Sequence, residues 1–197
     1  NEKQLLKHNS NRACEINVQL QATRNDIGFL KEHWARVLEN AKQKANADLL
    51  QLRDEQDKKL KEFDDKYKAI LSDPENLLPL EYKKSSSAVL LLRKKQSIFI
   101  NTNNFKMAKE IKKELKELEE KERNENFLKF QKKKTAERNL LIKKQDEMFA
   151  VRKENWYRTI EGIKSVANYE IEHARKSEKQ LESKLTNLQA QSMKMKS

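Results

Sequence analysis

The chain has 197 residues, and its 43 lysines and arginines exceed its 31 aspartates and glutamates, which gives a formal net charge of +12. Two glycines, two prolines and one cysteine are too few for the turns of a β-sandwich or barrel, a glycine-rich phosphate loop, an internal disulfide or a cysteine-based zinc site. No run of about 18 apolar residues is present, and residues 1–10 lack the apolar stretch of a signal peptide, so we expect a reducing compartment.

The composition favours long helices. Charged residues make up 38% of the chain, and Lys, Glu, Leu, Gln and Ala, all good helix formers, are abundant. Proline and glycine, which usually accompany disorder, are scarce. Because this composition with a repeat of about 3.5 residues is typical of coiled coils, the predicted fold class is all-α.

A first helix is predicted from about Leu5 to Leu71, because apolar residues recur there at heptad spacing. The two rows of this seam are Ala13, Leu20, Ile27, Trp34 and Ala41, and Ile16, Thr23, Leu30 and Val37. The register slips by one residue near Leu38 and then continues through Ala41, Ala45, Leu49, Leu52, Gln56, Leu60, Phe63, Tyr67 and Ile70.

A proline-containing loop is predicted over residues 72–85. The sequence Ser72-Asp73-Pro74 should stop the first helix, and Pro79 should prevent a restart. Three leucines inside the loop are unusual for a solvated linker, so we expect them to bind a protein partner: Leu77, Leu78 and Leu80. The serines at 85–87 are typical of a helix N-cap.

Two further helices are predicted on either side of an Asn-Thr-Asn-Asn turn at 101–104. The second helix, from about Ser86 to Ile100, has an apolar stripe of Ala88, Leu91, Leu92, Ile98 and Phe99. The third runs from Phe105 to about Gln191 and begins with a face of Phe105, Ala108, Ile111, Leu115 and Leu118. Its later core candidates are Leu128, Thr135, Ile142, Phe149, Trp156, Ile163, Ile171, Ala174, Leu181, Leu185 and Leu188.

The helix lengths suggest how these segments pair. We expect a coiled-coil helix at 1–71, the loop at 72–85, a short helical hairpin at 86–120, and a long helix at 121–197 that packs back on 1–71. The result would be a long antiparallel coiled-coil rod, with the first two helices stacked end to end along the third. In this register Trp34 lies opposite Trp156, both in the core. The alternative is a parallel homodimer of each helix.

The predicted hairpin carries a family resemblance. The sequence at 90–95, followed by 103–115 with Phe105, Ala108 and Ile111 at intervals of three, resembles the UVR motif over about residues 88–118. The resemblance implies a small antiparallel helical hairpin that makes protein–protein contacts. In general character the whole chain is also similar to the coiled-coil structural proteins of axonemes and other stable microtubule arrays.

No residue set that could carry catalysis emerges. None of His8, His33 and His173 is spaced to form a helical metal site with another, and Cys14 is expected to be a small buried residue. Acidic residues alternate with lysines, as on a solvated helix face. We therefore expect no enzyme activity, no cofactor and no metal.

Two clusters of positive charge are the candidate docking surfaces. The first consists of Lys83, Lys84, Arg93, Lys94 and Lys95, with no acidic residue between Lys83 and Lys95. The second is centred on Lys132, Lys133 and Lys134 and should lie opposite an acidic part of the first helix. Internal ion pairs should neutralise part of the second cluster, whereas the first has no evident internal partner.

These clusters indicate a structural protein that docks on an acidic polymer. A microtubule lattice fits best, because many weak contacts along a long helix add up. The predicted location is the cytoplasmic cytoskeleton, with a cilium or flagellum as one candidate, within a larger assembly. The competing hypothesis is an adaptor that binds other coiled-coil proteins. Nucleic acid fits less well because lysine is interleaved with glutamate, and an anionic membrane fits less well because no apolar face for insertion is evident.

Overall fold

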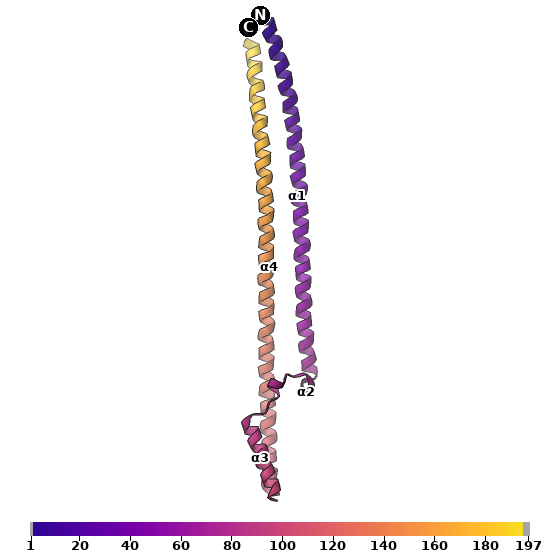
Figure 1. Ribbon diagram of the computed structural model, residues 1–197, viewed down its shortest axis with the longest axis vertical. Helices are drawn as coiled ribbons and strands as arrows, with labels where there is room; N and C mark the ends of the chain where they lie inside the picture. Colours follow the sequence, from indigo (N-terminus) through magenta and orange to yellow (C-terminus); the bar gives the residue numbers. More distant parts are fainter. Residues whose placement is uncertain (1, 195–197) are drawn as a thin grey trace. The chain divides into compact units, whose positions relative to one another are not determined.

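The computed structural model describes residues 2–194. Within this range all regular structure is helical and no strand occurs, which confirms the all-α prediction. The elements are α1 (Glu2–Ser72), α2 (Pro74–Leu77), the 3-10 turn η1 (Leu80–Tyr82), α3 (Ser87–Asn101) and α4 (Phe105–Lys194) (Figure 1). The helices α1, α3 and α4 agree with prediction to within a few residues, but α2 and η1 occupy the segment for which only a loop was expected.

Local chemistry explains where α1 ends and α2 begins. The Asp73 carboxylate accepts a hydrogen bond from the Asn76 N–H and so caps α2, while Pro74 occupies the first helical position. A proline is well tolerated there because its missing N–H would have had no helical acceptor. The loop therefore contains a short capped helix that the sequence analysis did not predict.

The turn between α3 and α4 forms as the asparagines predict. Asn103 has a φ of 57°, the left-handed conformation that asparagine tolerates better than most residues. The backbone N–H groups of Thr102, Asn103 and Asn104 close the end of α3 by donating to carbonyls of its last turn. Both devices reverse the chain with no glycine.

The contacts divide the chain into two compact units. One unit contains α1 up to Gln51 together with α4 from Phe149 onward, and the other contains residues 52–148. Each unit includes part of both long helices, and each is described separately below.

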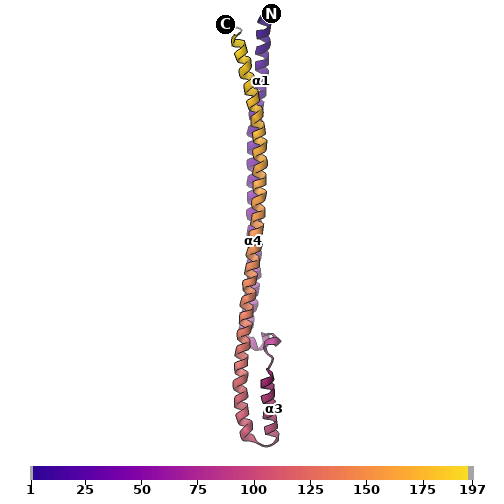
Figure 2. The ribbon, with the colours of Figure 1, turned by 90° about the vertical axis from the view of Figure 1, so that its left-hand side faces the viewer.

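In the first unit, the contacts between α1 and α4 run antiparallel; the two segments lie side by side in Figure 1, and α1 runs behind α4 in Figure 2. Arg24 forms ion pairs with Glu178 and Glu182, at 2.9 and 2.8 Å. Further along α1, the Trp34 indole donates to Glu170 at 2.9 Å.

The apolar seam of α1 in this unit is as predicted. Ile16, Leu20 and Ile27 are buried, as are Ala41 and Ala45 beyond the slip in the heptad register. Side chains three and four residues apart on a helix share one face, so this burial shows that a single continuous face of α1 meets α4.

The predicted pairing of the two tryptophans is wrong. Trp34 contacts Glu170, whereas the Trp156 indole donates to Asp48 at 2.7 Å. Asp48 also pairs with Arg152 at 2.9 Å. A heptad pattern matches its partner again after every shift by whole heptads, so apolar spacing cannot choose among these registers. Two indoles facing each other would each lack an acceptor, whereas the observed register gives each one a carboxylate.

In the second unit, two buried glutamines join α1 to α4. Gln56 donates its amide to the backbone carbonyl of Gln145 at 2.8 Å, and Gln145 donates to the carbonyl of Gln56 at 2.9 Å. Both side chains are buried. Two ion pairs flank this contact, Arg53 with Asp146 and Arg138 with Asp64, at 3.3 and 2.8 Å.

The aromatic core of the second unit forms around Phe130, which is completely buried. Its ring centroid lies 5.9 Å from that of Tyr67 and 5.4 Å from that of Tyr82. The prediction of Leu128 and Thr135 as core residues is wrong, because both are exposed. The seam of α4 is rotated here, so that Phe130 points inward.

The short hairpin of α3 and the start of α4 has its own small core. Val89 and Leu92 of α3 pack with Leu115 of α4, and Ile111 and Leu118 lie against them. Ala108 is also buried, whereas Phe105 is 65% exposed, contrary to the prediction. The predicted stripe of α3 is likewise partly wrong. Leu92 and Phe99 face inward, whereas three other predicted members are exposed: Ala88, Leu91 and Ile98.

Replacing Phe130 with alanine tests this register. A fully buried phenylalanine typically contributes about 3–5 kcal/mol when truncated, because contacts are lost and a cavity remains. We expect Phe130→Ala to lower the free energy of unfolding by that amount, measured by urea denaturation followed by circular dichroism. Leu128→Ala is the matched control, and it should change the free energy by no more than about 0.5 kcal/mol. The opposite ranking would restore the register predicted from the heptads.

Acid should destabilise the fold through its cross-helix carboxylates. The indole N–H of Trp156, and then Arg152, lower the pKa of Asp48 below its usual 3.8, and Arg138 does the same for Asp64. A carboxyl whose pKa is lowered by folding stabilises the folded state above its unfolded pKa, and loses that contribution as the pH falls through the folded value. We therefore expect the melting temperature to drop below about pH 4. Asp48→Asn should flatten that drop, and an unchanged acid profile would contradict the assignment.

Candidate interaction surface

The segment between α1 and α3 is folded onto the second unit. Leu78 is buried, and Tyr82 places its ring edge against Phe130. The carboxylate of Glu81 lies 3.2 Å from the ammonium of Lys133, which also sits 5.8 Å from the centre of the Tyr82 ring. The hydrogen bond from Lys133 lowers the pKa of Glu81, and the same bond raises the pKa of Lys133.

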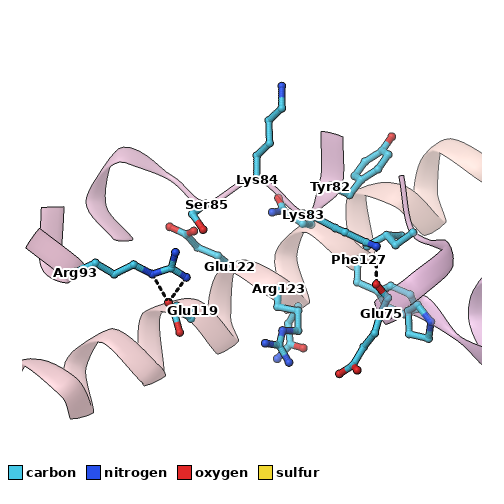
Figure 3. Close-up of a pocket in the computed structure, with 14 residues that line it drawn as sticks. Glu75, Tyr82, Lys83, Lys84, Ser85, Arg93, Glu119, Glu122, Arg123 and Phe127 are labelled. Carbon is cyan, nitrogen blue, oxygen red and sulfur yellow. Dashed lines mark hydrogen bonds and ion pairs between the residues drawn. The ribbon is translucent and has the colours of Figure 1, made fainter. Parts of the chain in front are cut away.

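Lys83 closes the loop on itself. Its ammonium donates to the backbone carbonyls of Glu75 and Asn76, at 2.5 and 3.3 Å. Those carbonyls belong to the short helix α2 and have few helical partners of their own. Lys83 therefore stabilises the loop, and its charge is directed inward, as Figure 3 shows.

An open groove of about 580 Å³ lies where this loop meets α3 and α4 (Figure 3). Pro74, Leu78 and Phe127 provide apolar lining. Its polar lining includes Glu75, Lys83, Lys84, Arg93, Glu119, Glu122 and Arg123. The mixture of apolar floor and charged rim suits a peptide segment better than a small, deeply enclosed ligand.

Two acidic residues of α4 anchor the start of α3. The Ser86 side chain accepts from the N–H of Val89 and so caps α3, while its hydroxyl and N–H both donate to Glu122. Arg93 donates from two nitrogens to one oxygen of Glu119, at 2.9 and 2.6 Å. The expectation that the first basic cluster has no internal partner is therefore wrong for Arg93.

The remaining basic candidates fall into two groups. Four of them are exposed and form no ion pair within the described range, residues 2–194: Lys84, Lys94, Lys95 and Lys132. Lys133 and Lys134 are paired, with Glu81 and Glu137 respectively. Lys134 also lies over the rings of Phe63 and Phe130, at 5.8 and 5.9 Å from their centres. The structure thus separates the predicted docking residues that already form an ion pair from those that form none.

The three loop leucines also separate. Leu78 packs inside the second unit and lines the groove, whereas Leu77 is 49% and Leu80 is 77% exposed. The expected packing is therefore internal for Leu78. Leu77 and Leu80 are left in contact with solvent and can meet a partner.

The sequence analysis missed the acidic anchors Glu119 and Glu122. Their signal was present, because the acidic run at 117–122 follows the lysine-rich start of α4. In an antiparallel hairpin that run must lie beside the start of α3, where Arg93 and Ser86 are. Aligning the two helices outward from the turn would therefore have placed an acidic residue beside Arg93.

Other chemistry-bearing residues are scattered. Cys14 is exposed, so its predicted burial is wrong. His33 contacts Trp34 edge-on and His173 lies near Tyr169, with centroids 5.3 and 6.4 Å apart. The described side chains contain no group of three or more His, Cys, Asp or Glu placed to hold a metal ion. None of the described helices has the length and apolar character needed to cross a membrane.

Comparisons with models of protein families, with curated protein sequences and with solved structures find no match to this chain. Functional inference therefore rests on its own residues.

The cap of α3 offers a direct test of how the hairpin is anchored. We expect Ser86→Ala to destabilise the start of α3 by about 1 kcal/mol, because the Val89 N–H loses its acceptor and Glu122 loses its donor. Amide hydrogen exchange should become several-fold faster in the first turn of α3. Ser87→Ala is the control, since Ser87 is exposed and is not the capping residue. Equal exchange rates in the two variants would rule out this anchor.

Proposed function

We propose that this chain is a non-enzymatic structural protein, a long antiparallel coiled coil that docks on the acidic surface of a microtubule, in a cilium or axoneme. The observation that carries the proposal is the distribution of paired and unpaired charge. The antiparallel contacts found within each unit support the coiled-coil arrangement, and the net charge of +12 supports an acidic partner.

Several acidic residues are engaged in ion pairs between helices. Asp48, Asp64 and Asp146 all pair with arginines across the α1–α4 contacts. Glu119, Glu178 and Glu182 likewise accept from arginines on a neighbouring helix. These carboxylates are already paired, and the net charge of +12 means that the remaining side chains carry an excess of positive charge.

The predicted docking lysines that remain free lie on the second unit. Lys94 and Lys95 lie on the solvent side of α3, because Val89, Leu92 and Phe99 turn the opposite side toward α4. Lys84 extends away from the groove (Figure 3). Individual surface charges attract weakly, but several on one rigid element add through effective concentration.

Co-sedimentation with microtubules tests the proposal. We expect the purified chain to pellet with microtubules at low salt and to be released at high salt, because the Debye length falls from about 10 Å at 0.1 M to about 3 Å at 1 M. Lys94→Glu combined with Lys95→Glu should weaken binding by about tenfold or more. Removing the acidic tubulin tails should have a similar effect.

The matched control is Lys58→Glu combined with Lys59→Glu. These two exposed, adjacent lysines of α1 give the same change in net charge. If both pairs weaken binding equally, the attraction depends on net charge alone, and a defined docking surface is contradicted. Absence of pelleting at every salt concentration would sink lattice binding.

A second candidate function is an adaptor for other coiled-coil proteins, and the exposed leucines favour it. Leu77 and Leu80 lie close in sequence to Leu78, which lines the groove, and both of their side chains are exposed. The resemblance of the α3–α4 hairpin to the UVR motif points the same way, toward protein contacts. Under this hypothesis Leu80→Glu would abolish partner binding, while reversal of Lys94 and Lys95 would leave it unchanged.

A further inference from the structure

We propose that two copies of this chain associate through the outer face of α1, antiparallel and about a two-fold axis at the level of Trp34. The proposal concerns a different surface from the lysines of the proposed function and does not depend on microtubule binding. It rests on an exposed face whose composition is wrong for permanent contact with water.

The face in question lies opposite the seam with α4. At about 100° per residue, Val18, Phe29 and Leu50 fall on one line along α1, while Ile16 and Ile27 point the other way into the seam. Ile16 and Ile27 are 8% and 6% exposed, and the three outer residues are 66%, 69% and 65% exposed. Large apolar side chains thus recur on the solvent side of this helix.

Charge is depleted along the same line. A path of three- and four-residue steps from Cys14 through Asn40 to Leu50 has eleven positions, of which only Glu32 and Arg36 are charged, and Glu39 lies beside this path. A chain with 38% charged residues would place about four charges there at random, and a solvent face normally holds more. Beyond Leu50 the same spacing gives Asp54, Lys58, Lys61 and Asp65, an ordinary solvated face. This charge-poor stripe is therefore a local feature of residues 14–50.

The order of residues along the stripe identifies a second copy as the occupant. The positions are nearly symmetric about Trp34: Val18 mirrors Leu50, Asn25 mirrors Gln43, and Glu32 mirrors Arg36. In a two-fold contact, residue i of one copy meets residue j of the other and the reverse also holds. At these three pairs of positions, antiparallel α1 helices would place apolar on apolar, amide on amide and acid on base, whereas Phe29 would lie opposite Glu39.

The two charged residues are the strongest part of this argument. Both are exposed, and within the described residues neither Glu32 nor Arg36 forms an ion pair, either with the other or with α4. An antiparallel dimer centred between them would make two equivalent Glu32–Arg36 pairs. A parallel dimer would place like charges side by side, Glu32 on Glu32 and Arg36 on Arg36, which is unfavourable. The stripe is thus self-complementary in one orientation.

Sedimentation equilibrium of the full chain over about 1–100 µM is the first measurement, and it needs no microtubules. We expect a reversible monomer–dimer equilibrium. Val18→Glu combined with Phe29→Glu should raise the dissociation constant by about a hundredfold, because two apolar anchors are lost from each copy. Leu80→Glu combined with Leu140→Glu is the control, with two exposed leucines off the stripe. A chain that remains monomeric throughout this range would overturn the proposal.

Charge exchange keeps the test independent of folding. Glu32→Arg alone should weaken the dimer by about tenfold, because the new arginine of each copy then faces Arg36 of the other copy. Adding Arg36→Glu should restore the dissociation constant to within about twofold of the original. If the double exchange does not restore association, the pairing of Glu32 with Arg36 is wrong.

Cross-linking fixes the orientation. In a Cys14→Ser background, Asn25→Cys with Gln43→Cys should join two copies through a short bismaleimide. The two cysteines of one chain are about 27 Å apart along the helix, too far for such a reagent to bridge. Either single variant should give no covalent dimer, because equivalent residues are also about 27 Å apart in the antiparallel register. A covalent dimer from a single variant would show a parallel contact and overturn the proposal.

Discussion

The register between α1 and α4 depends on polar contacts. Two helices that meet along a narrow apolar seam can slide by whole heptads and still match apolar residues. The reciprocal exchange of amide-to-carbonyl hydrogen bonds between Gln56 and Gln145 has no such freedom, because it needs both glutamines in the same layer. A buried polar group without a partner costs much more than a mismatched apolar contact. Sliding by one heptad would place Arg138 or Arg152 in the layer of Gln56 and break the reciprocal exchange.

Fixing the register through buried glutamines carries a desolvation cost. The carbonyl oxygen of the Gln56 side chain is buried, and among the described atoms it has no hydrogen-bond partner. An apolar pair at this layer would avoid that desolvation, but it would leave the second unit without its most specific cross-helix contact. A buried polar residue that fixes register at the expense of stability is well known in coiled coils. The glutamine pair fits that role here.

These contacts also explain which parts of the fold could be predicted. The buried face of α1 follows from period alone, and Ile16, Leu20 and Ile27 are buried as expected. The partner of each residue on α4 depends on register, which the heptads leave open, so Trp34 and Trp156 were wrongly paired. In α3, three successive leucines at 90–92 leave the inward face ambiguous. The structure chooses Leu92 because Val89 lies one turn before it.

The same distinction governs the candidate surface. Clusters of lysine are visible in the sequence, but whether a charge is available depends on which carboxylate lies across from it. Arg93 and Lys133 are held by Glu119 and Glu81, which are distant in the sequence. Lys94 and Lys95 have no such neighbour, because α3 turns them away from α4. The structure therefore reduces a predicted basic cluster to the few residues that can meet a partner.

Self-association through α1 would change the strength of docking without any new contact to the lattice. Each copy presents Lys84, Lys94 and Lys95 on the second unit, whereas the charge-poor stripe lies in the first. A dimer thus carries two basic surfaces, and binding of one raises the effective concentration of the other. Weak individual ion pairs, of about 0–1 kcal/mol each, can then support firm attachment. The charge-poor face of α1 would bring two copies together, and the basic face of α3 in each copy would then bind the lattice.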